Sequence, residues 1–154
     1  MCRQWALRGD SGGPGRHRGG LGAVYEIELL EQSADAFLFG ERGRHAPAGV
    51  VGGDHAALNR FTYPAGPEGG EAHPPMASKM VGIKLVQGQS VLLETPGGGG
   101  YGPAAERDPA EVAEDVRLGY VSPTAARDRY LVAVAEDGTL DQDATQELRA
   151  GEAA

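Results

Sequence analysis

The sequence predicts an α+β fold, in which a β-rich module of hairpins and long glycine-rich loops precedes two or three short C-terminal helices. Three observations support this prediction. Apolar and polar residues alternate in several short runs before residue 95. Glycine-rich segments separate these runs, and 25 of the 154 residues are glycine. After residue 106 the apolar period becomes helical, with cap and stop residues at the places that helices need.

The period-two runs define the strands of the β-rich module. In chain order, the expected strands cover residues 3–7, 21–29, 36–40, 59–63, 80–86 and 90–94. The second run is expected to pair with the third across the turn at 31–35, and the fifth with the sixth across the turn at 87–89. The first run is expected to continue another sheet, and the rest of 41–78 is expected to be loop.

Cap residues place the helices. Asp108, Pro109 and Glu111 form a capping-box pattern, and Gly119 marks the end of that helix. Ser122 followed by proline predicts a second helix to about residue 130. A brief strand at 131–135, a turn at Asp137-Gly138 and a last short helix from Asp143 are expected to follow. The charged residues of the first helix, Glu111, Glu114 and Asp115 with Arg107 and Arg117, read as a solvated face.

These elements divide the chain into residues 1–106, a β-rich glycine-loop module, and residues 107–150, a helical segment packed on it. Residues 151–154 are expected to be a frayed tail. Together they are expected to form one domain that belongs to a larger subunit. With 9 aromatic residues and 35 glycines and prolines, a large self-sufficient core is not expected.

Charge and cysteine content exclude several classes of protein. Residues 102–154 carry 12 acidic and 5 basic side chains, which argues against nucleic-acid binding there. Cys2 is the single cysteine, so neither a disulfide framework nor a cysteine-based zinc site is expected. No run resembles a signal peptide or a membrane span, so a cytoplasmic location is expected. The 12 arginines against two lysines fit a GC-rich bacterial gene.

Short motifs offer no catalytic centre. Residues 9–14 match the nucleophile loop of chymotrypsin-like proteases, but nine residues precede Asp10 and none of them is histidine. The four histidines show no metal-ligand spacing, and exposed loop positions explain them better. Lys79 precedes a strand and is expected either to bind a carboxylate or phosphate or to protect a sheet edge. The run Gly97–Gly100 lacks the Lys-Ser/Thr of a phosphate-binding P-loop, so a hinge or a tight crossing is favoured.

Two long glycine-rich runs, in order, resemble the C-terminal part of the hydantoinase B/oxoprolinase family, whose members include N-methylhydantoinase B and 5-oxoprolinase B-type subunits. The first is Asp10-Ser-Gly-Gly-Pro-Gly-Arg-His-Arg-Gly-Gly-Leu-Gly22, and the second is Leu93-Glu-Thr-Pro-Gly-Gly-Gly-Gly-Tyr-Gly102. Arg107-Asp-Pro, Asp115–Ser122 and Asp137-Gly-Thr continue the match, which covers roughly residues 3–150. The several hundred residues that precede the first run in the family have no counterpart in this sequence.

The resemblance implies part of an ATP-dependent enzyme that opens cyclic amides such as hydantoin, 5-oxoproline or a lactam, although some relatives carboxylate ketones. It implies two partners, a hydantoinase A-type subunit that uses ATP and the rest of a B-type subunit, which carries a divalent metal. This chain is expected to be inactive alone, with no catalytic, metal or cofactor residues of its own. The expected substrate or subunit contacts are Gly12, Gly13, Arg16, Arg18, Gly19, Gly20, Lys79, Gly97, Gly98, Gly99, Gly100 and Tyr101. The alternative is a free-standing, non-catalytic module that binds a larger hydantoinase- or acetone-carboxylase-like enzyme.

Overall fold

The computed structural model describes residues 1–152, which fall into two compact units. The strand unit contains Met1–Arg8, Gly22–Ala46 and Leu58–Pro96. The glycine–helix unit contains Gly9–Leu21, Pro47–Ala57 and the described part of Gly97–Ala154. The predicted boundary lay at residue 106, whereas here the glycine-rich segments and the helices together form one compact unit.

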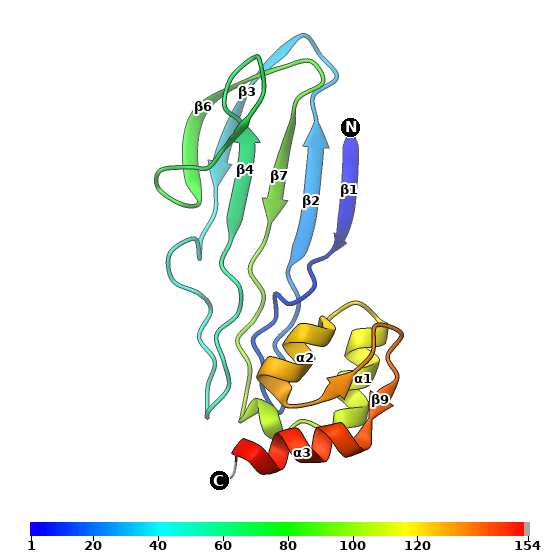
Figure 1. Cartoon of the computed structure of the whole chain (residues 1–154). Coiled ribbons are helices and arrows are strands. Elements are labelled where there is room, and N and C mark those ends of the chain that lie inside the picture. The colour runs from blue at the N-terminus through cyan, green and yellow to red at the C-terminus, as the bar shows by residue number, and fades with distance from the viewer. Residues whose placement is uncertain (153–154) are drawn as a thin grey trace. The chain divides into compact units, whose positions relative to one another are not determined.

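The strand unit consists of two antiparallel sheets (Figure 1). Its strands are β1 (Cys2–Leu7), β2 (Ala23–Glu28), β3 (Ser33–Phe39), β4 (Arg60–Pro64), β5 (Glu71–Ala72), β6 (Lys79–Val86) and β7 (Ser90–Glu94). The order in the larger sheet is β1-β2-β7-β4-β5, and β3 and β6 form the smaller one. Leu38, Ile83 and Leu85 of the smaller sheet pack with Phe61 of the larger one, which places the unit's core between the sheets.

Both predicted hairpins are wrong, although each of the six predicted strands is present. β2 pairs with β1 and β7, whereas β3 pairs with β6. The two turns bond to each other instead of closing hairpins: the Leu29 N–H donates to the Gln89 carbonyl (2.9 Å), and the Gly88 N–H donates to the Leu29 carbonyl (2.9 Å). Each turn therefore carries the chain from one sheet to the other. The short strand β5, in the segment predicted as loop, was not expected.

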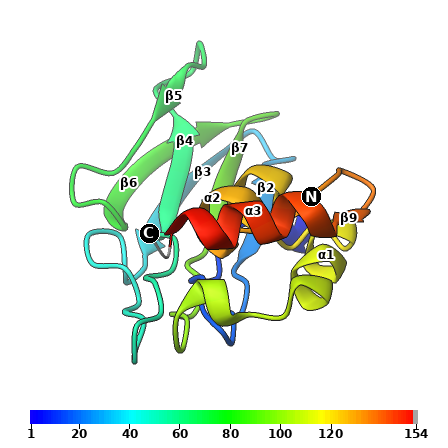
Figure 2. The same ribbon diagram turned by 60° about the horizontal axis from the view of Figure 1, so that its bottom comes forward.

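A 3-10 turn, three α-helices and a two-stranded ribbon form the other described part of the glycine–helix unit. They are the 3-10 turn η1 (Ala104–Glu106), α1 (Pro109–Arg117), α2 (Pro123–Tyr130), β8 (Ala133–Val134), β9 (Leu140–Asp141) and α3 (Gln142–Glu152). The helices gather around the ribbon of β8 and β9 (Figures 1 and 2). The apolar core of the glycine–helix unit consists of buried side chains that are all at most 5% exposed, namely Val112, Val116, Val121, Ala126, Tyr130 and Val132. No helix within residues 1–152 has the length and apolar character that a membrane crossing requires.

The predicted caps are present in modified form. The Asp108 carboxylate accepts from the Ala110 N–H (2.8 Å), while Glu111 pairs with the Arg107 guanidinium (3.1 Å) instead of completing a capping box. The Ser122 hydroxyl accepts from the Ala125 N–H (3.1 Å) and starts α2.

The later C-terminal boundaries differ from the prediction. Leu131 is left-handed (φ 55°) and ends α2, so the strand expected at 131–135 shortens to β8. Residues 151 and 152, which the sequence assigns to the tail, are the last residues of α3. Residues 153–154 lie outside the described residues.

Candidate functional site

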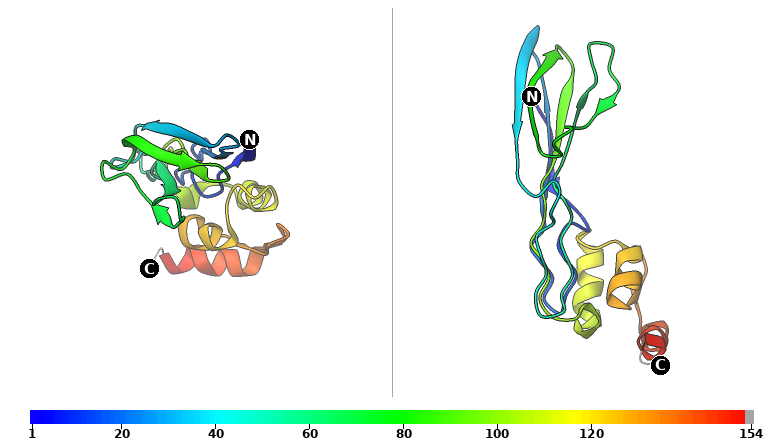
Figure 3. Two further views of the ribbon diagram at one scale, coloured as in Figure 1. Left: turned by 90° about the horizontal axis from the view of Figure 1, so that it is seen from above. Right: turned by 90° about the vertical axis from the view of Figure 1, so that its left-hand side faces the viewer.

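The glycine-rich segments of the glycine–helix unit run side by side as extended chains (Figure 3). They exchange backbone hydrogen bonds although they are not regular strands. The Gly13 N–H donates to the Gly98 carbonyl (2.9 Å), and the Gly98 N–H donates to the Gly20 carbonyl (2.8 Å). The Gly100 N–H donates to the Asp54 carbonyl (2.9 Å). These segments, within residues 11–20, 47–57 and 97–102, are called the glycine stack below.

Missing side chains make this stack possible. A Cβ atom on Gly19 would collide with the carbonyl of Gly98, and one on Gly99 would collide with the carbonyl of Ala48. The same holds against other backbone atoms for a larger set, namely Gly12, Gly13, Gly97 and Gly100. Gly20 and Gly98 differ, because a Cβ atom there would meet no atom closer than 3.4 Å. Six of the eight predicted glycines thus fix backbone packing, whereas Gly20 has open space beside it and Gly98 has room for a Cβ atom in ordinary van der Waals contact.

Two of the predicted contact residues, Arg16 and Tyr101, are partly exposed on this unit. His17 and Tyr101 exchange backbone N–H to carbonyl bonds, each 3.0 Å long. The Tyr101 residue is 43% exposed, and the Arg16 guanidinium lies 5.9 Å from the centre of its ring. Arg16 also pairs with Glu106 (3.3 Å), and both side chains are about half exposed. Arg16 and Tyr101 therefore remain accessible to another molecule.

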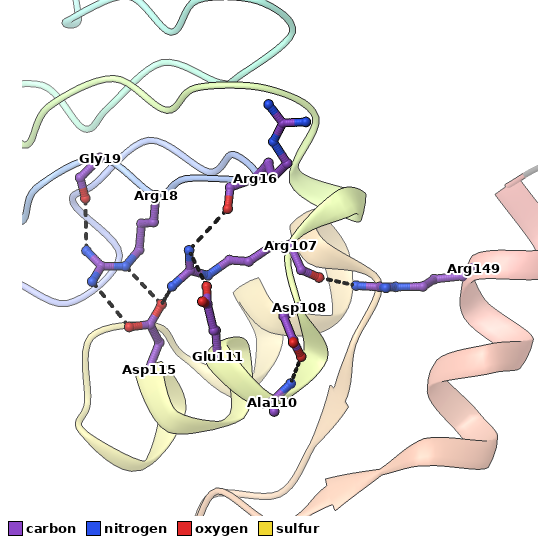
Figure 4. A network of polar contacts seen from close by, with 9 residues as sticks. All are labelled: Arg16, Arg18, Gly19, Arg107, Asp108, Ala110, Glu111, Asp115 and Arg149. Atoms are coloured by element: carbon purple, nitrogen blue, oxygen red, sulfur yellow. Dashed lines mark hydrogen bonds and ion pairs between the residues drawn. The ribbon is translucent and has the colours of Figure 1, made fainter.

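The Arg18 guanidinium, in contrast, forms its hydrogen bonds with other residues of the same unit (Figure 4). Its Nε and Nη2 atoms donate to the two oxygens of Asp115 (3.0 and 3.2 Å), and its Nη1 donates to the Gly19 carbonyl (2.9 Å). Arg107 Nη2 donates to the same carboxylate (3.1 Å). The Arg149 Nη2 in turn donates to the Arg107 carbonyl (2.7 Å). One carboxylate thus holds two guanidiniums and connects the glycine stack to α1.

The prediction that Asp115 lies on a solvated face is wrong. This residue is 6% exposed, and its side chain lies beside those of Arg18 (16% exposed) and Arg107 (12%). A sequence signal was available, because Asp115 follows Val112 by three residues and precedes Val116, and both valines belong to the core. The sequence does not reveal the role of Arg107, because one partner, the Arg16 carbonyl, is distant in the chain and another, Asp115, lies on the buried side of α1.

A tyrosine packs in the core of the same unit. The Tyr130 side chain is almost fully buried, and this burial raises its pKa to about 12, against the opposing effect of Arg107 and Arg18. It borders a groove of about 450 Å³ that also contains Asp10, His55 and Asp128.

The groove does not contain the protease centre suggested by residues 9–14. Ser11 is completely buried, and the Asp10 carboxylate accepts from the Ser122 N–H (2.8 Å). A nucleophile must be reachable by its substrate, so the hexapeptide is part of the stack and not a catalytic loop.

The described residues do not fit a divalent metal. Among residues 1–152, no three His, Cys, Asp or Glu side chains come close enough together to hold one. Lys79, the last predicted contact, belongs to the strand unit and pairs with Glu41 (2.9 Å). The predicted site residues therefore divide between the two units, with all but Lys79 in the glycine–helix unit.

A tightly bonded glycine stack and an internal arginine clamp thus characterise the glycine–helix unit of this α+β protein. A family model described as hydantoinase B/oxoprolinase matches residues 1–104, and the chain belongs to this family.

Relatives and solved structures agree with this assignment. The chain is 36% identical to the caprolactamase subunit beta of Pseudomonas jessenii, over 97% of this chain and 26% of that subunit. The crystal structure of the ATP-dependent caprolactamase from the same organism superposes with a TM-score of 0.81 at 34% identity, over 96% of this chain and 26% of that one. Acetone carboxylase, at 23% identity, shares the fold with a TM-score of 0.85 over 99% of this chain and 24% of its own.

The chain thus spans about a quarter of the length of these relatives. Its placement at their C-terminal end stays a prediction.

Proposed function

We propose that this chain is a segment of the B-type subunit of an ATP-dependent cyclic-amide hydrolase and has no turnover alone. The observation that carries the proposal is the 36% identity to a caprolactamase subunit across nearly the whole chain. Caprolactam is a cyclic amide, and the related crystal structure is that of an ATP-dependent enzyme. A hydantoinase A-type partner in the cytoplasm would bind ATP, and the rest of the B-type subunit would supply a divalent metal.

The glycine stack supports a scaffolding role within such a subunit. Backbones that touch without side chains cannot slide or tilt without breaking hydrogen bonds, so loops held by the stack keep fixed positions. Gly20 and Gly98 are exposed on this frame, and so, in part, are Arg16 and Tyr101. We assign these four residues to the rim that faces substrate or a neighbouring subunit, and Arg18 to the frame itself.

An exposed sheet edge is compatible with both candidates, the segment of a larger subunit and a free-standing module that binds a larger enzyme. β1 ends the larger sheet, and no other strand among residues 1–152 pairs with its outer side. All six of its residues are exposed, including Trp5 (75%) and Leu7. The outer side of the smaller sheet exposes Phe37 and Phe39. Such apolar surface and an unpaired edge are typical of a contact with another polypeptide.

Binding separates the two candidates. The matching quarter is deleted from the caprolactamase subunit beta, and this chain is added in trans to the truncated or the complete enzyme. A segment of the subunit should bind the truncated enzyme and should be excluded from the complete one, in which its place is filled. A free-standing module should bind the complete enzyme as well, and failure to bind either would contradict both candidates.

A further inference from the structure

A hollow of about 480 Å³ in the strand unit gathers basic side chains and plays no part in the proposed function. It is formed by the loop 40–45, which follows β3, and by residues at the start of β6. Its lining residues are Gly40, Glu41, Arg42, Gly43, Arg44, His45, Met76, Ser78 and Lys79. Its volume lies within the usual range of small-ligand sites.

The charge of this hollow is opposite to that of the protein. The chain as a whole carries a formal net charge of −8. Arg42, Arg44 and Lys79 face a single carboxylate, Glu41, which leaves two positive charges in excess with His45 neutral. Lys79 donates to Glu41 (2.9 Å), and this hydrogen bond is the main reason why the pKa of Glu41 lies below its usual value. Dianions are repelled by the chain as a whole and attracted at this place.

The two arginines have no carboxylate partner within hydrogen-bonding distance among residues 1–152. Most guanidiniums of the protein have a carboxylate partner, as Arg18 and Arg129 do. Within residues 1–152, the guanidiniums of Arg42 and Arg44 form neither a hydrogen bond nor an ion pair. Their donors are free to bind a ligand, and planar guanidiniums bind phosphate oxygens in pairs.

The backbone around the hollow is held in an uncommon conformation. Arg42 has a φ of 62° and Ala77 a φ of 61°, values that residues with a side chain rarely adopt. The surroundings impose these values, because the Asn59 N–H donates to the Arg42 carbonyl (3.0 Å) and the Gly40 N–H donates to the Ser78 carbonyl (2.8 Å). Backbone strain on both sides of one hollow is typical of a binding site.

We propose that this hollow binds a tetrahedral dianion, either free phosphate or the phosphate group of a small monoester. Arg42 and Arg44 donate to its oxygens, and Lys79, already next to Glu41, adds a third cation. The excess of two positive charges matches a dianion better than a single carboxylate. This inference does not depend on the proposed function, because it rests on the strand unit alone.

Isothermal titration calorimetry on the full chain tests this site, at low ionic strength and about pH 8, where a phosphate monoester is a dianion. The probes are inorganic phosphate, phenyl phosphate and acetate. Both phosphates should bind with a Kd of about 10 mM or lower that rises with added NaCl, and acetate should bind at least about tenfold more weakly. Tighter binding of phenyl phosphate than of phosphate would identify a monoester as the ligand, and the reverse would identify free phosphate.

Matched variants make the result specific. Arg42→Asn with Arg44→Gln removes two charges, and asparagine tolerates the left-handed conformation at position 42. This double variant should lose at least about tenfold in phosphate affinity while its thermal melting stays unchanged. Arg127→Gln removes an arginine of α2 that likewise has no ion pair within residues 1–152 and should bind as the wild type does. Equal binding by the double variant, no binding by the wild type, or equally tight acetate binding would overturn the proposal.

Discussion

Replacing Asp115 by asparagine probes the arginine clamp of the glycine–helix unit. Asparagine keeps the size of the side chain but removes the charge that Arg18 and Arg107 share, at a position that is 6% exposed. Removing one partner of a buried ion pair costs about 3–5 kcal/mol. One amide oxygen can still accept, and the two guanidiniums retain some contact with water, so we expect a loss of about 3 kcal/mol, the lower end of that range. For a chain of this size, that loss lowers the melting temperature by about 6–12 °C.

Differential scanning calorimetry measures this shift, and the same helix provides the control. Glu114 pairs with Arg117, but both side chains are more than half exposed, so Glu114→Gln should leave the melting temperature unchanged. An Asp115→Asn protein that melts within about 1 °C of the wild type would refute the claim that the Asp115 carboxylate stabilises the unit by holding two guanidiniums.

Three further predictions follow from the site. Gly19→Ala should destabilise the protein by about 3 kcal/mol or more in urea unfolding, because backbone atoms cannot yield, whereas Gly20→Ala should be neutral; equal effects would contradict the glycine stack. The raised pKa of Tyr130 means that its contribution to stability is complete below about pH 10 and is lost as the pH rises to about 12, so Tyr130→Phe should abolish that part of the alkaline loss in thermal melts; an identical loss in both proteins would exclude this tyrosine as its cause. Arg18→Ala should lower the melting temperature, whereas Arg16→Ala should keep it and weaken binding to the truncated caprolactamase in gel filtration; the opposite pattern would reverse their assigned roles.

Local signals in the sequence predict the elements but not their partners. Asp108 and Ser122 place the starts of α1 and α2 because a cap needs only the next two or three residues. The alternation in β2 and β3 shows that each has a buried side, yet the same pattern suits any neighbouring strand. The choice between a hairpin and two sheets depends on the bonds between Leu29 and the turn at Gln89, which lie 60 residues apart in the sequence.

For the candidate site too, the sequence predicts which segments take part but not which residues they contact. The glycine runs mark where backbones approach closely, but a glycine carries no side chain that would indicate its partner. Arg18 and Asp115 lie 97 positions apart, so no spacing rule connects them. The hollow with Arg42 and Arg44 was also missed, because its charge becomes visible only when the loop after β3 lies beside Lys79.

The turnover of a chimera tests directly whether this chain is part of an ATP-dependent cyclic-amide hydrolase. This chain replaces the matching quarter of the caprolactamase subunit beta, and ATP-dependent ring opening of caprolactam is measured in the reassembled enzyme. We expect turnover by the chimera and none by the chain alone or by the enzyme that lacks this quarter. A chimera that folds and assembles but shows no turnover, while the original segment restores it, would contradict the claim that this chain is the equivalent part of such an enzyme.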